Sequence, residues 1–145
     1  MPTRKARTTW TGGLQDGSGE VELVSSGLAT FDVSFPKRAA DEADGTTSPE
    51  ELIAAAHSAC FSMGLANAIT TAGGTAKSLV TDVEVRLGPD PAGGFHIPGI
   101  HITVRGDVEG LDEAQFVAAA EGAKAGCPVS KALTGTTITL DAALA

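Results

Sequence analysis

The sequence has no tyrosine, a single tryptophan and only 2 cysteines, and its 10 basic residues are outnumbered by 18 acidic ones. The shortage of aromatic side chains leaves no platform on which nucleic-acid bases could stack. A net charge of −8 is equally unfavourable for binding phosphate backbones, which require a basic surface. The two shortages together argue against a nucleic-acid partner.

The sequence is also expected to lack a signal-peptide core and any apolar run long enough to span a bilayer. A hydrophobic content of 42% and a charged content of 19% are typical of a soluble globular protein. The length of 145 residues predicts one domain covering residues 1–145. We therefore expect a cytoplasmic protein with no membrane partner.

Alternation of apolar residues predicts three strands near the start of the chain, at residues 5–11, 20–25 and 30–35. Short glycine-containing turns separate them, which favours an antiparallel meander with one packed face. Proline 36 is expected to end the third strand. The acidic loop that follows is expected to be a solvated surface.

The remaining pattern predicts two long helices and three further strands. Both long helices carry start signals, and the expected elements are a helix at 48–71, strands at 80–87 and 100–106, a helix at 112–126, a short helix at 128–133 and a strand at 136–140. The order βββ-α-ββ-α-β indicates an α+β fold, with mainly antiparallel sheets and two long helices packed on them.

The first long helix is the most informative stretch. Ser48 is a good N-cap, Pro49 suits the first helical position, and Glu51 completes a capping box. The helix is apolar almost all round, which predicts that it is buried. Its expected apolar face contains five residues in particular: Leu52, Ile53, Ala56, Cys60 and Met63.

The two cysteines occupy different environments. Cys60 lies in the middle of the apolar helix, where burial would raise the thiol pKa, so an inert core cysteine is one interpretation. Cys127 precedes Pro128, in an N-cap position where backbone N–H groups favour a thiolate, although a structural role is again open. The two cysteines form neither a C-x-x-C pair nor a zinc ribbon, and no histidine has metal-ligand spacing relative to them.

Three stretches of the chain together resemble the osmotically inducible protein C (OsmC) family, which also contains the organic hydroperoxide resistance (Ohr) proteins. They are Ser48-Pro49-Glu50-Glu51-Leu52, Ala55-Ala56-His57-Ser58-Ala59-Cys60-Phe61-Ser62-Met63 and Lys124-Ala125-Gly126-Cys127-Pro128-Val129-Ser130-Lys131-Ala132-Leu133. The residues on either side of Cys60 are more similar to the OsmC branch. Ser48 stands where asparagine is usual in the family.

The resemblance implies a thiol-dependent reductase of hydroperoxides, organic ones especially. By motif match, Cys60 would be the peroxidatic thiol and Cys127 the resolving thiol that forms a disulfide with it. Glu50 would match the family's glutamate, and Arg38 its arginine, beside the reactive sulfur. No bound cofactor or metal is implied, and an external dithiol, for example of the lipoyl type, would act as the reductant. Leu52, Phe61 and Met63 are expected to line an apolar substrate pocket.

The separation of Glu50 and Cys60 along the helix indicates how the chain could assemble. Glu50 and Cys60 are ten residues apart, which corresponds to about 15 Å of rise on a straight helix. A glutamate side chain cannot span that length, so either the helix breaks or Glu50 serves the Cys60 of a partner subunit. We expect the second arrangement, an intertwined homodimer with active sites at the interface, which agrees with the resemblance.

Two other classes of function remain open. A non-enzymatic stress-related protein that binds small molecules would use both thiols only structurally. A cysteine hydrolase would require a base beside Cys60, and His57, one turn earlier on the same apolar helix, is poorly placed for an exposed ester. A hydrolase also has no need of Cys127, whereas a disulfide cycle does.

Overall fold

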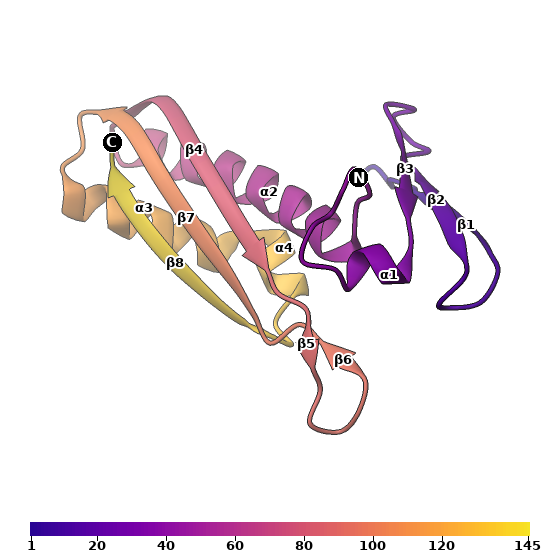
Figure 1. Cartoon of the computed structure of the whole chain (residues 1–145). Coiled ribbons are helices and arrows are strands. Elements are labelled where there is room, and N and C mark those ends of the chain that lie inside the picture. The colour runs from indigo at the N-terminus through magenta and orange to yellow at the C-terminus, as the bar shows by residue number, and fades with distance from the viewer. The chain divides into compact units, whose positions relative to one another are not determined.

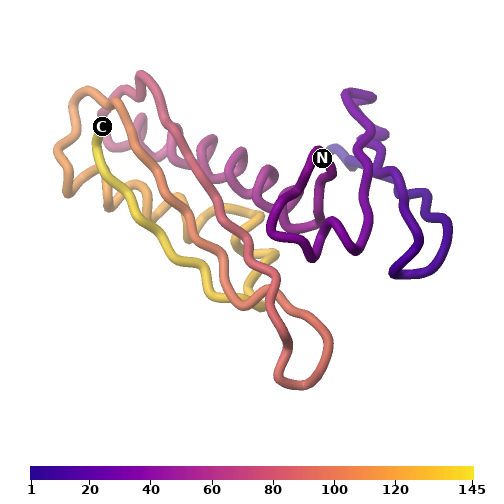
Figure 2. Tube along the Cα trace, viewed as in Figure 1, coloured from indigo at the N-terminus to yellow at the C-terminus, as the bar shows by residue number.

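A computed structural model describes all residues from Met1 to Ala145, which fall into two compact units, Met1–Leu52 and Ile53–Ala145. The elements of each unit are labelled in Figure 1 and the path of the chain is traced in Figure 2. The sequence-based expectation of one domain over residues 1–145 stays a prediction. Each unit is described here by itself.

The first unit contains the predicted three-stranded meander. Its strands are β1 (Arg7–Thr11), β2 (Ser18–Glu22) and β3 (Thr30–Val33), paired antiparallel in the order β1-β2-β3. Every residue of β1 is exposed, and Val21 is the only buried hydrophobic residue in the first unit. The expectation of a well-packed face is therefore not met within this chain.

The third strand is shorter than predicted because a helical turn replaces its end. In α1 (Phe35–Arg38), the Ser34 hydroxyl accepts a hydrogen bond from the Lys37 N–H, and Pro36 lies in the first turn. A serine N-cap followed by proline is a helix-start signal, and here it outweighs the continued apolar alternation. Arg38 is the last residue of this helix.

The long helix α2 (Pro49–Thr71) has the predicted bounds. Ser48 Oγ accepts the Glu51 N–H at 3.1 Å, which confirms the N-cap, while the Glu51 carboxylate accepts from the Thr47 hydroxyl. The helix ends where Gly73 adopts a φ of +88° and the Gly74 N–H donates to the Ile69 carbonyl. That pattern is the Schellman motif, for which glycine is favoured.

The second unit is built on a sheet of β4 (Thr75–Val85), β7 (Gly99–Glu109) and β8 (Thr137–Leu144), in the order β4-β7-β8. A small hairpin of β5 (Gly88–Pro89) and β6 (Phe95–His96) interrupts the connection between β4 and β7. β4 and β7 are antiparallel, whereas β7 and β8 are parallel. Parallel neighbours require a crossover, and α3 (Glu113–Gly126) and α4 (Pro128–Ala132) provide it. The α+β class is as predicted, and so is the order of the longer elements, to which the structure adds α1 and the β5–β6 hairpin.

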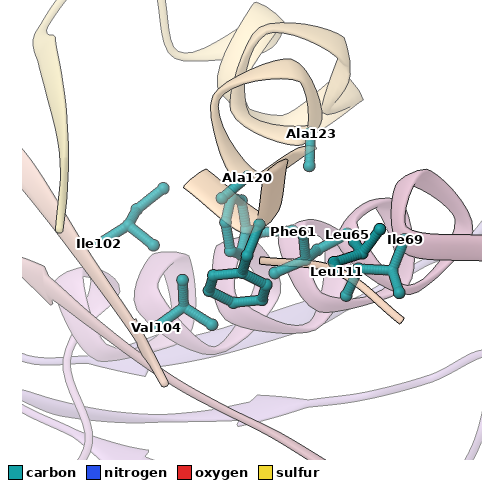
Figure 3. Packing of buried hydrophobic residues seen from close by; sticks show 9 residues of the cluster. Phe61, Leu65, Ile69, Ile102, Val104, Leu111, Ala120 and Ala123 are labelled. Atoms are coloured by element: carbon teal, nitrogen blue, oxygen red, sulfur yellow. The ribbon is translucent and has the colours of Figure 1, made fainter. Parts of the chain in front are cut away.

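The core of the second unit lies between the sheet and the two long helices (Figures 1 and 3). Helix α3 begins with the predicted capping box of Asp112 and Gln115. The buried cluster draws its side chains from α2, β7, the loop between β7 and α3, and α3: Phe61, Leu65, Ile69, Ile102, Val104, Leu111, Phe116, Ala120 and Ala123. These residues hold α2 and α3 against one face of the sheet.

The predicted buried face of α2 is wrong. The fully buried residues of its C-terminal part are His57, Phe61, Leu65 and Ile69, spaced four apart, while Met63 is 72% exposed. Small residues such as alanine, serine and glycine are spread over the other positions, so the sequence pattern hardly distinguishes one face from another. The large side chains determine which face of α2 is buried. The alanine-rich face of α2 is left uncovered in this chain.

Helix α2 is long and apolar enough, by length and composition alone, to cross a membrane. The expectation that the sequence holds no such run is therefore wrong, because the only charged residues in these 23 positions are Glu50 and Glu51. One such helix is weak evidence, since the core helix of a soluble protein passes the same test. Phe61, Leu65 and Ile69 have no exposed surface, so one face of α2 lies in the core of the second unit.

Gly106 and Gly122 offer a matched test of this packing. A Cβ on Gly106 of β7 would lie 2.6 Å from Phe116 Cε2 and 3.2 Å from Leu79 Cδ2, whereas one on Gly122 of α3 would meet nothing within 4 Å. We expect Gly106→Ala to lower the free energy of unfolding by about 1–3 kcal/mol. Gly122→Ala should raise it by about 1 kcal/mol, because alanine is the better helix former. Urea denaturation of both variants checks the pair, and equal effects would contradict this core.

Candidate functional site

The two cysteines are brought together within the second unit. Cys60 Sγ on α2 lies 2.9 Å from Cys127 Sγ, and both are free thiols. The separation is within hydrogen-bond reach and well beyond the covalent S–S length of about 2.05 Å. Cys127 is 2% exposed, whereas Cys60 is partly accessible. The thiols therefore form a reduced pair in which one cysteine is partly exposed and the other is enclosed.

Proline explains how Cys127 reaches this position. A residue before proline is kept out of the helical region, and Cys127 accordingly has a ψ of 122°. Its N–H still donates to the Ala123 carbonyl and closes α3, while its own carbonyl accepts from Lys131 in α4. The Cys-Pro step thus ends one helix and starts the next, and the cysteine side chain lies at the junction.

The surroundings of the two sulfurs shift their pKa values in opposite directions. Burial, and then the hydrogen bond with Cys127, raise the pKa of Cys60. Burial also acts to raise the pKa of Cys127, but hydrogen bonding with Cys60 and then with Ser130 outweighs it, so that the pKa is lowered. Cys127 is the N-cap residue of α4, as expected, but its side chain makes no cap hydrogen bond, and the favoured thiolate stays a prediction. The side chain of Lys124, three residues before Cys127, forms an ion pair with Glu121 at 2.7 Å.

A second polar contact joins the same two helices. His57 Nε2 lies 2.7 Å from Ser130 Oγ, and both residues are buried. Burial lowers the pKa of His57, so the imidazole is neutral near physiological pH. From the sequence, His57 was considered only as a poorly placed base, and Ser130 only as a member of the third stretch that resembles the family. Their spacing was the available signal, because each lies one helical turn from a cysteine.

Arg38 and Glu50 are brought together within the first unit. Arg38 Nε donates to both carboxylate oxygens of Glu50, at 3.2 and 3.1 Å, and Nη2 donates to Oε1 at 2.7 Å. Glu50 is only 7% exposed, and burial alone would raise its pKa, but the Arg38 guanidinium outweighs this and the pKa is lowered. The hydrogen bond with Glu50 raises the pKa of Arg38. Both groups are therefore charged, and the expected two-point contact is present.

An apolar cavity of about 530 Å³ lies beside this pair in the first unit. Apart from Arg38 it is lined mainly by apolar side chains and hydroxyls, from Thr8, Trp10, Leu14, Val21, Val33, Ser34, Phe35, Thr47, Pro49 and Leu52. The predicted pocket of Leu52, Phe61 and Met63 is wrong. Phe61 is fully buried in the core and Met63 is exposed, while Leu52 lines the cavity of the first unit.

The structure thus provides an α+β fold in which a reduced cysteine pair lies between a long helix and a Cys-Pro turn. The class defined by these features is that of dithiol proteins of mixed α and β structure. The family model described as OsmC-like protein matches residues 41–141, and the chain belongs to this family.

Two curated relatives are similar over most of their length. Peroxiredoxin OsmC of Escherichia coli (strain K12) is 40% identical over 138 residues, which cover 95% of this chain and 94% of the relative. Organic hydroperoxide resistance protein OhrA of Bacillus subtilis (strain 168) is 32% identical over 121 residues, which cover 82% and 84% of the two chains. The resemblance seen in the sequence is confirmed.

Solved structures agree on the fold. The organic hydroperoxide resistance protein OhrB of Bacillus subtilis has a TM-score of 0.75 at 28% identity, covering 95% of this chain and 97% of its own. An organic hydroperoxide resistance protein OsmC of Legionella pneumophila has a TM-score of 0.78 at 26% identity, covering 99% and 98%. The roles of Cys60, Cys127, Arg38 and Glu50 stay predictions from the motif match.

The Arg38–Glu50 pair makes the first unit sensitive to acid. Because the pKa of Glu50 is lowered on folding, its stabilising contribution is complete above the ordinary carboxylate range and is lost as the pH falls below about 4. We expect Glu50→Gln to lower the free energy of unfolding at neutral pH by about 1–3 kcal/mol. The difference from the wild type should shrink on acidification.

Glu51→Gln is the matched control, because Glu51 is exposed on the same helical turn and contacts only the Thr47 hydroxyl among side chains. It should change the stability little at either pH. The measurement is urea denaturation at neutral and acidic pH. A Glu50→Gln effect that does not depend on pH would show that the ion pair contributes no stability.

Proposed function

We propose that this protein is a thiol-dependent reductase of organic hydroperoxides. The observation that carries the proposal is the approach of Cys60 Sγ and Cys127 Sγ to 2.9 Å, with one sulfur accessible and the other enclosed. A structural role for two free thiols does not require that proximity, whereas a disulfide cycle does. The names of the relatives, peroxiredoxin and organic hydroperoxide resistance protein, point to the same chemistry.

The cycle has three steps. The Cys60 thiolate attacks the peroxide, so that the O–O bond breaks, Cys60 becomes a sulfenic acid, and the alkoxide takes a proton and leaves as the alcohol. Cys127 then attacks the sulfenic sulfur, forming the Cys60–Cys127 disulfide and releasing water. An external dithiol, of which the lipoyl group is one type, supplies two electrons and two protons by exchange and restores both thiols. The cycle needs no bound cofactor.

The accessibility of the two sulfurs supports this order of roles. A peroxide must reach the sulfur that it oxidises, and Cys60 is partly exposed while Cys127 is 2% exposed. The resolving thiol has no such need, since it only has to meet Cys60. The roles given by the motif match and the roles given by exposure are therefore the same.

The second unit lacks a cation that would stabilise the Cys60 thiolate. Burial raises the pKa of Cys60, so an additional cation is needed to ionise it. Arg38 meets the requirement, because its guanidinium stays charged, is held by Glu50 and has further N–H groups to polarise a peroxide oxygen. The apolar cavity beside Arg38 would suit the organic part of an alkyl or acyl hydroperoxide.

We propose that Arg38 and Glu50 come to each Cys60 from a partner copy of the chain, in an intertwined homodimer. Helix α2 runs unbroken from Pro49 to Thr71, so the alternative of a helix break before Cys60 has no support. A ten-residue separation amounts to about 15 Å of rise, too far for a glutamate side chain. Because Arg38 and Glu50 contact each other, one chain would supply both.

The exposure of apolar residues is consistent with a partner copy. Three strands with almost no buried residues are rarely stable alone. Trp10 is 42% exposed, Leu14 59% and Met63 72%, on the meander and on α2. A second copy of the chain that covers these residues would give the first unit the core that it lacks. We place the whole assembly in the cytoplasm, where dithiol reductants are available.

Replacement of each cysteine tests the cycle. Cys60→Ser should abolish dithiol-dependent consumption of cumene hydroperoxide, because it removes the attacking sulfur. Cys127→Ser should permit a single oxidation and then accumulate Cys60 sulfenic acid, which dimedone traps for mass spectrometry. Hydrogen peroxide should be consumed more slowly than the organic substrate. Wild-type turnover no faster than the free dithiol would favour a non-enzymatic binding protein that uses the apolar cavity.

Complementation tests the shared site. Arg38→Met and Cys60→Ser should each be inactive alone, and their mixture should regain about a quarter of wild-type activity after subunit exchange, since half of the dimers then carry one complete site. Steady-state turnover of cumene hydroperoxide before and after exchange is the measurement, with each variant exchanged against itself as the control. A fully active monomer would exclude the shared site.

A further inference from the structure

The reduced cysteine pair presents two sulfur ligands at a short separation. Cys60 Sγ and Cys127 Sγ lie 2.9 Å apart, and both are free thiols. Sulfur is a soft ligand, so two sulfurs side by side are suited to a soft acceptor. The distance between them, together with the groups nearby, determines which acceptor both sulfurs can hold at once.

A buried hydrogen bond beside the pair limits how far the sulfurs can separate. His57 Nε2 lies 2.7 Å from Ser130 Oγ, His57 has no exposed surface and Ser130 is 7% exposed. On α2, His57 lies one helical turn before Cys60, and in the chain Ser130 follows shortly after Cys127. Moving α4 away from α2 would break this hydrogen bond and leave two buried polar groups unpaired, which is unfavourable. The hydrogen bond therefore opposes a wide separation of the sulfurs.

The bond geometry of an acceptor sets the sulfur separation that it requires. With a bond of about 2.3 Å to each sulfur, a linear two-coordinate ion holds its sulfurs about 4.6 Å apart, and a tetrahedral ion holds them about 3.7 Å apart. A trivalent pyramidal centre, whose bond angles are close to a right angle, holds them only about 3.3 Å apart at the same bond length. The observed separation of 2.9 Å is closest to the pyramidal case.

The number of ligands available points the same way. No group of three or more histidine, cysteine or acidic residues in this chain could hold a metal ion. A tetrahedral ion such as zinc would have only the two sulfurs and would be weakly held, because stable zinc sites use three or four protein ligands. A trivalent pyramidal centre needs only two protein sulfurs, since its third bond goes to a substituent of its own.

The unequal exposure of the two cysteines suits an acceptor with one outward substituent. Cys60 is partly exposed, whereas Cys127 is 2% exposed. An acceptor can therefore bind the sulfur of Cys60 first and then close onto Cys127, with its third substituent on the exposed side. The enclosed bond to Cys127 is then protected from thiols in solution.

We propose that Cys60 and Cys127 form a chelating site for trivalent arsenic, as arsenite or as an organic arsenical. With an arsenical of the type R–As=O, two S–As bonds form, the arsenic–oxygen double bond breaks, and the two thiol protons leave with the oxygen as water. Neither sulfur nor arsenic changes its oxidation state, so the step requires no oxidant or reductant. The site goes beyond the proposed peroxidase function and would block it, because one ligand occupies both sulfurs.

Titration with phenylarsine oxide tests the proposal without any peroxide. The wild type should take up one phenylarsenic group per chain, measured by the mass of the intact protein, and lose both reactive thiols. Excess glutathione, a monothiol, should leave the adduct in place, whereas ethanedithiol should remove it. Cys60→Ser and Cys127→Ser are the matched controls, because each keeps a single thiol. We expect the wild type to bind at least about a hundredfold more tightly than either variant, the gain from a second tethered ligand. Equal affinities would overturn the proposal.

The oxidised wild type is a second control that changes no residue, and it covers the case in which a serine variant does not fold. Oxidation with diamide converts both thiols to the disulfide and removes both ligands. The oxidised protein should take up no arsenic, and reduction should restore the uptake. Uptake that persists after both thiols are lost would place the arsenic elsewhere, contrary to the proposal.

Competition with zinc tests the geometric part of the inference. Zinc should bind the reduced wild type no more tightly than it binds Cys127→Ser, as measured with a zinc-responsive indicator, and it should not displace phenylarsenic. Zinc binding that competes with the arsenical would contradict selection by the sulfur separation.

A single turnover connects the site to the proposed function. After one equivalent of phenylarsine oxide, and with no dithiol present, the wild type should consume no cumene hydroperoxide. Unchanged consumption by the fully loaded protein would show that the arsenical does not occupy both sulfurs. If the untreated wild type consumes no peroxide, the proposed function fails, while the arsenical titration still decides whether the two cysteines form this site.

Discussion

The free-energy cost of burying a thiolate determines how the two cysteines of this protein can react. An ionised thiol loses its hydration on burial, and only nearby donors or cations compensate. The two cysteines meet this requirement by different means. Cys127 is within hydrogen-bond distance of the neighbouring thiol, and hydrogen bonding outweighs burial, so its pKa is lowered. The pKa of Cys60 is instead raised, by burial and by Cys127 itself. The asymmetry separates a sulfur that is ready to attack from one that must first be activated.

The activation of Cys60 connects the chemistry to the assembly. A guanidinium is suited to the task because it cannot lose its charge and presents several donors in a fixed plane. Arg38 is already oriented by a buried carboxylate, so a partner would bring it into place without further ordering of its side chain. The same partner would cover the apolar side of α2 and the meander. Catalysis and stability would thus depend on one association, and a chain that fails to associate would lose both.

Local chemistry in the sequence was enough to predict much of the fold. The N-cap at Ser48, the capping box at Asp112 and the break at Pro128 are short-range signals, and each appears as expected. The buried face of α2 was not predictable in this way, because alanine is equally acceptable on either side of a helix. Phe61 decides that face through contacts with distant elements of the sheet and α3. The helical turn at Ser34 was missed because apolar alternation continued across it.

In the candidate site, too, the residues in local motifs could be predicted from the sequence, whereas a contact between distant residues could not. The four residues matched to the family, Cys60, Cys127, Arg38 and Glu50, were found from sequence motifs, and the structure brings them together as two separate pairs. The pairing of His57 with Ser130 was hidden, since a hydrogen bond between residues of two helices leaves no local pattern. Its only trace is that each residue lies one turn from a cysteine, a spacing whose meaning depends on knowing that the two cysteines meet.

The lowered pKa of Cys127 has a consequence for both halves of the proposed cycle. In the oxidative half, it favours the thiolate that attacks the sulfenic acid. In the reductive half, the external dithiol must attack the accessible sulfur, which is that of Cys60, so the leaving group is the Cys127 thiolate. A thiol of lower pKa leaves faster in exchange reactions. The arrangement that makes Cys127 a ready nucleophile therefore also makes it a good leaving group. Because the accessible sulfur receives both the peroxide and the reductant, the enclosed one needs no opening to solvent.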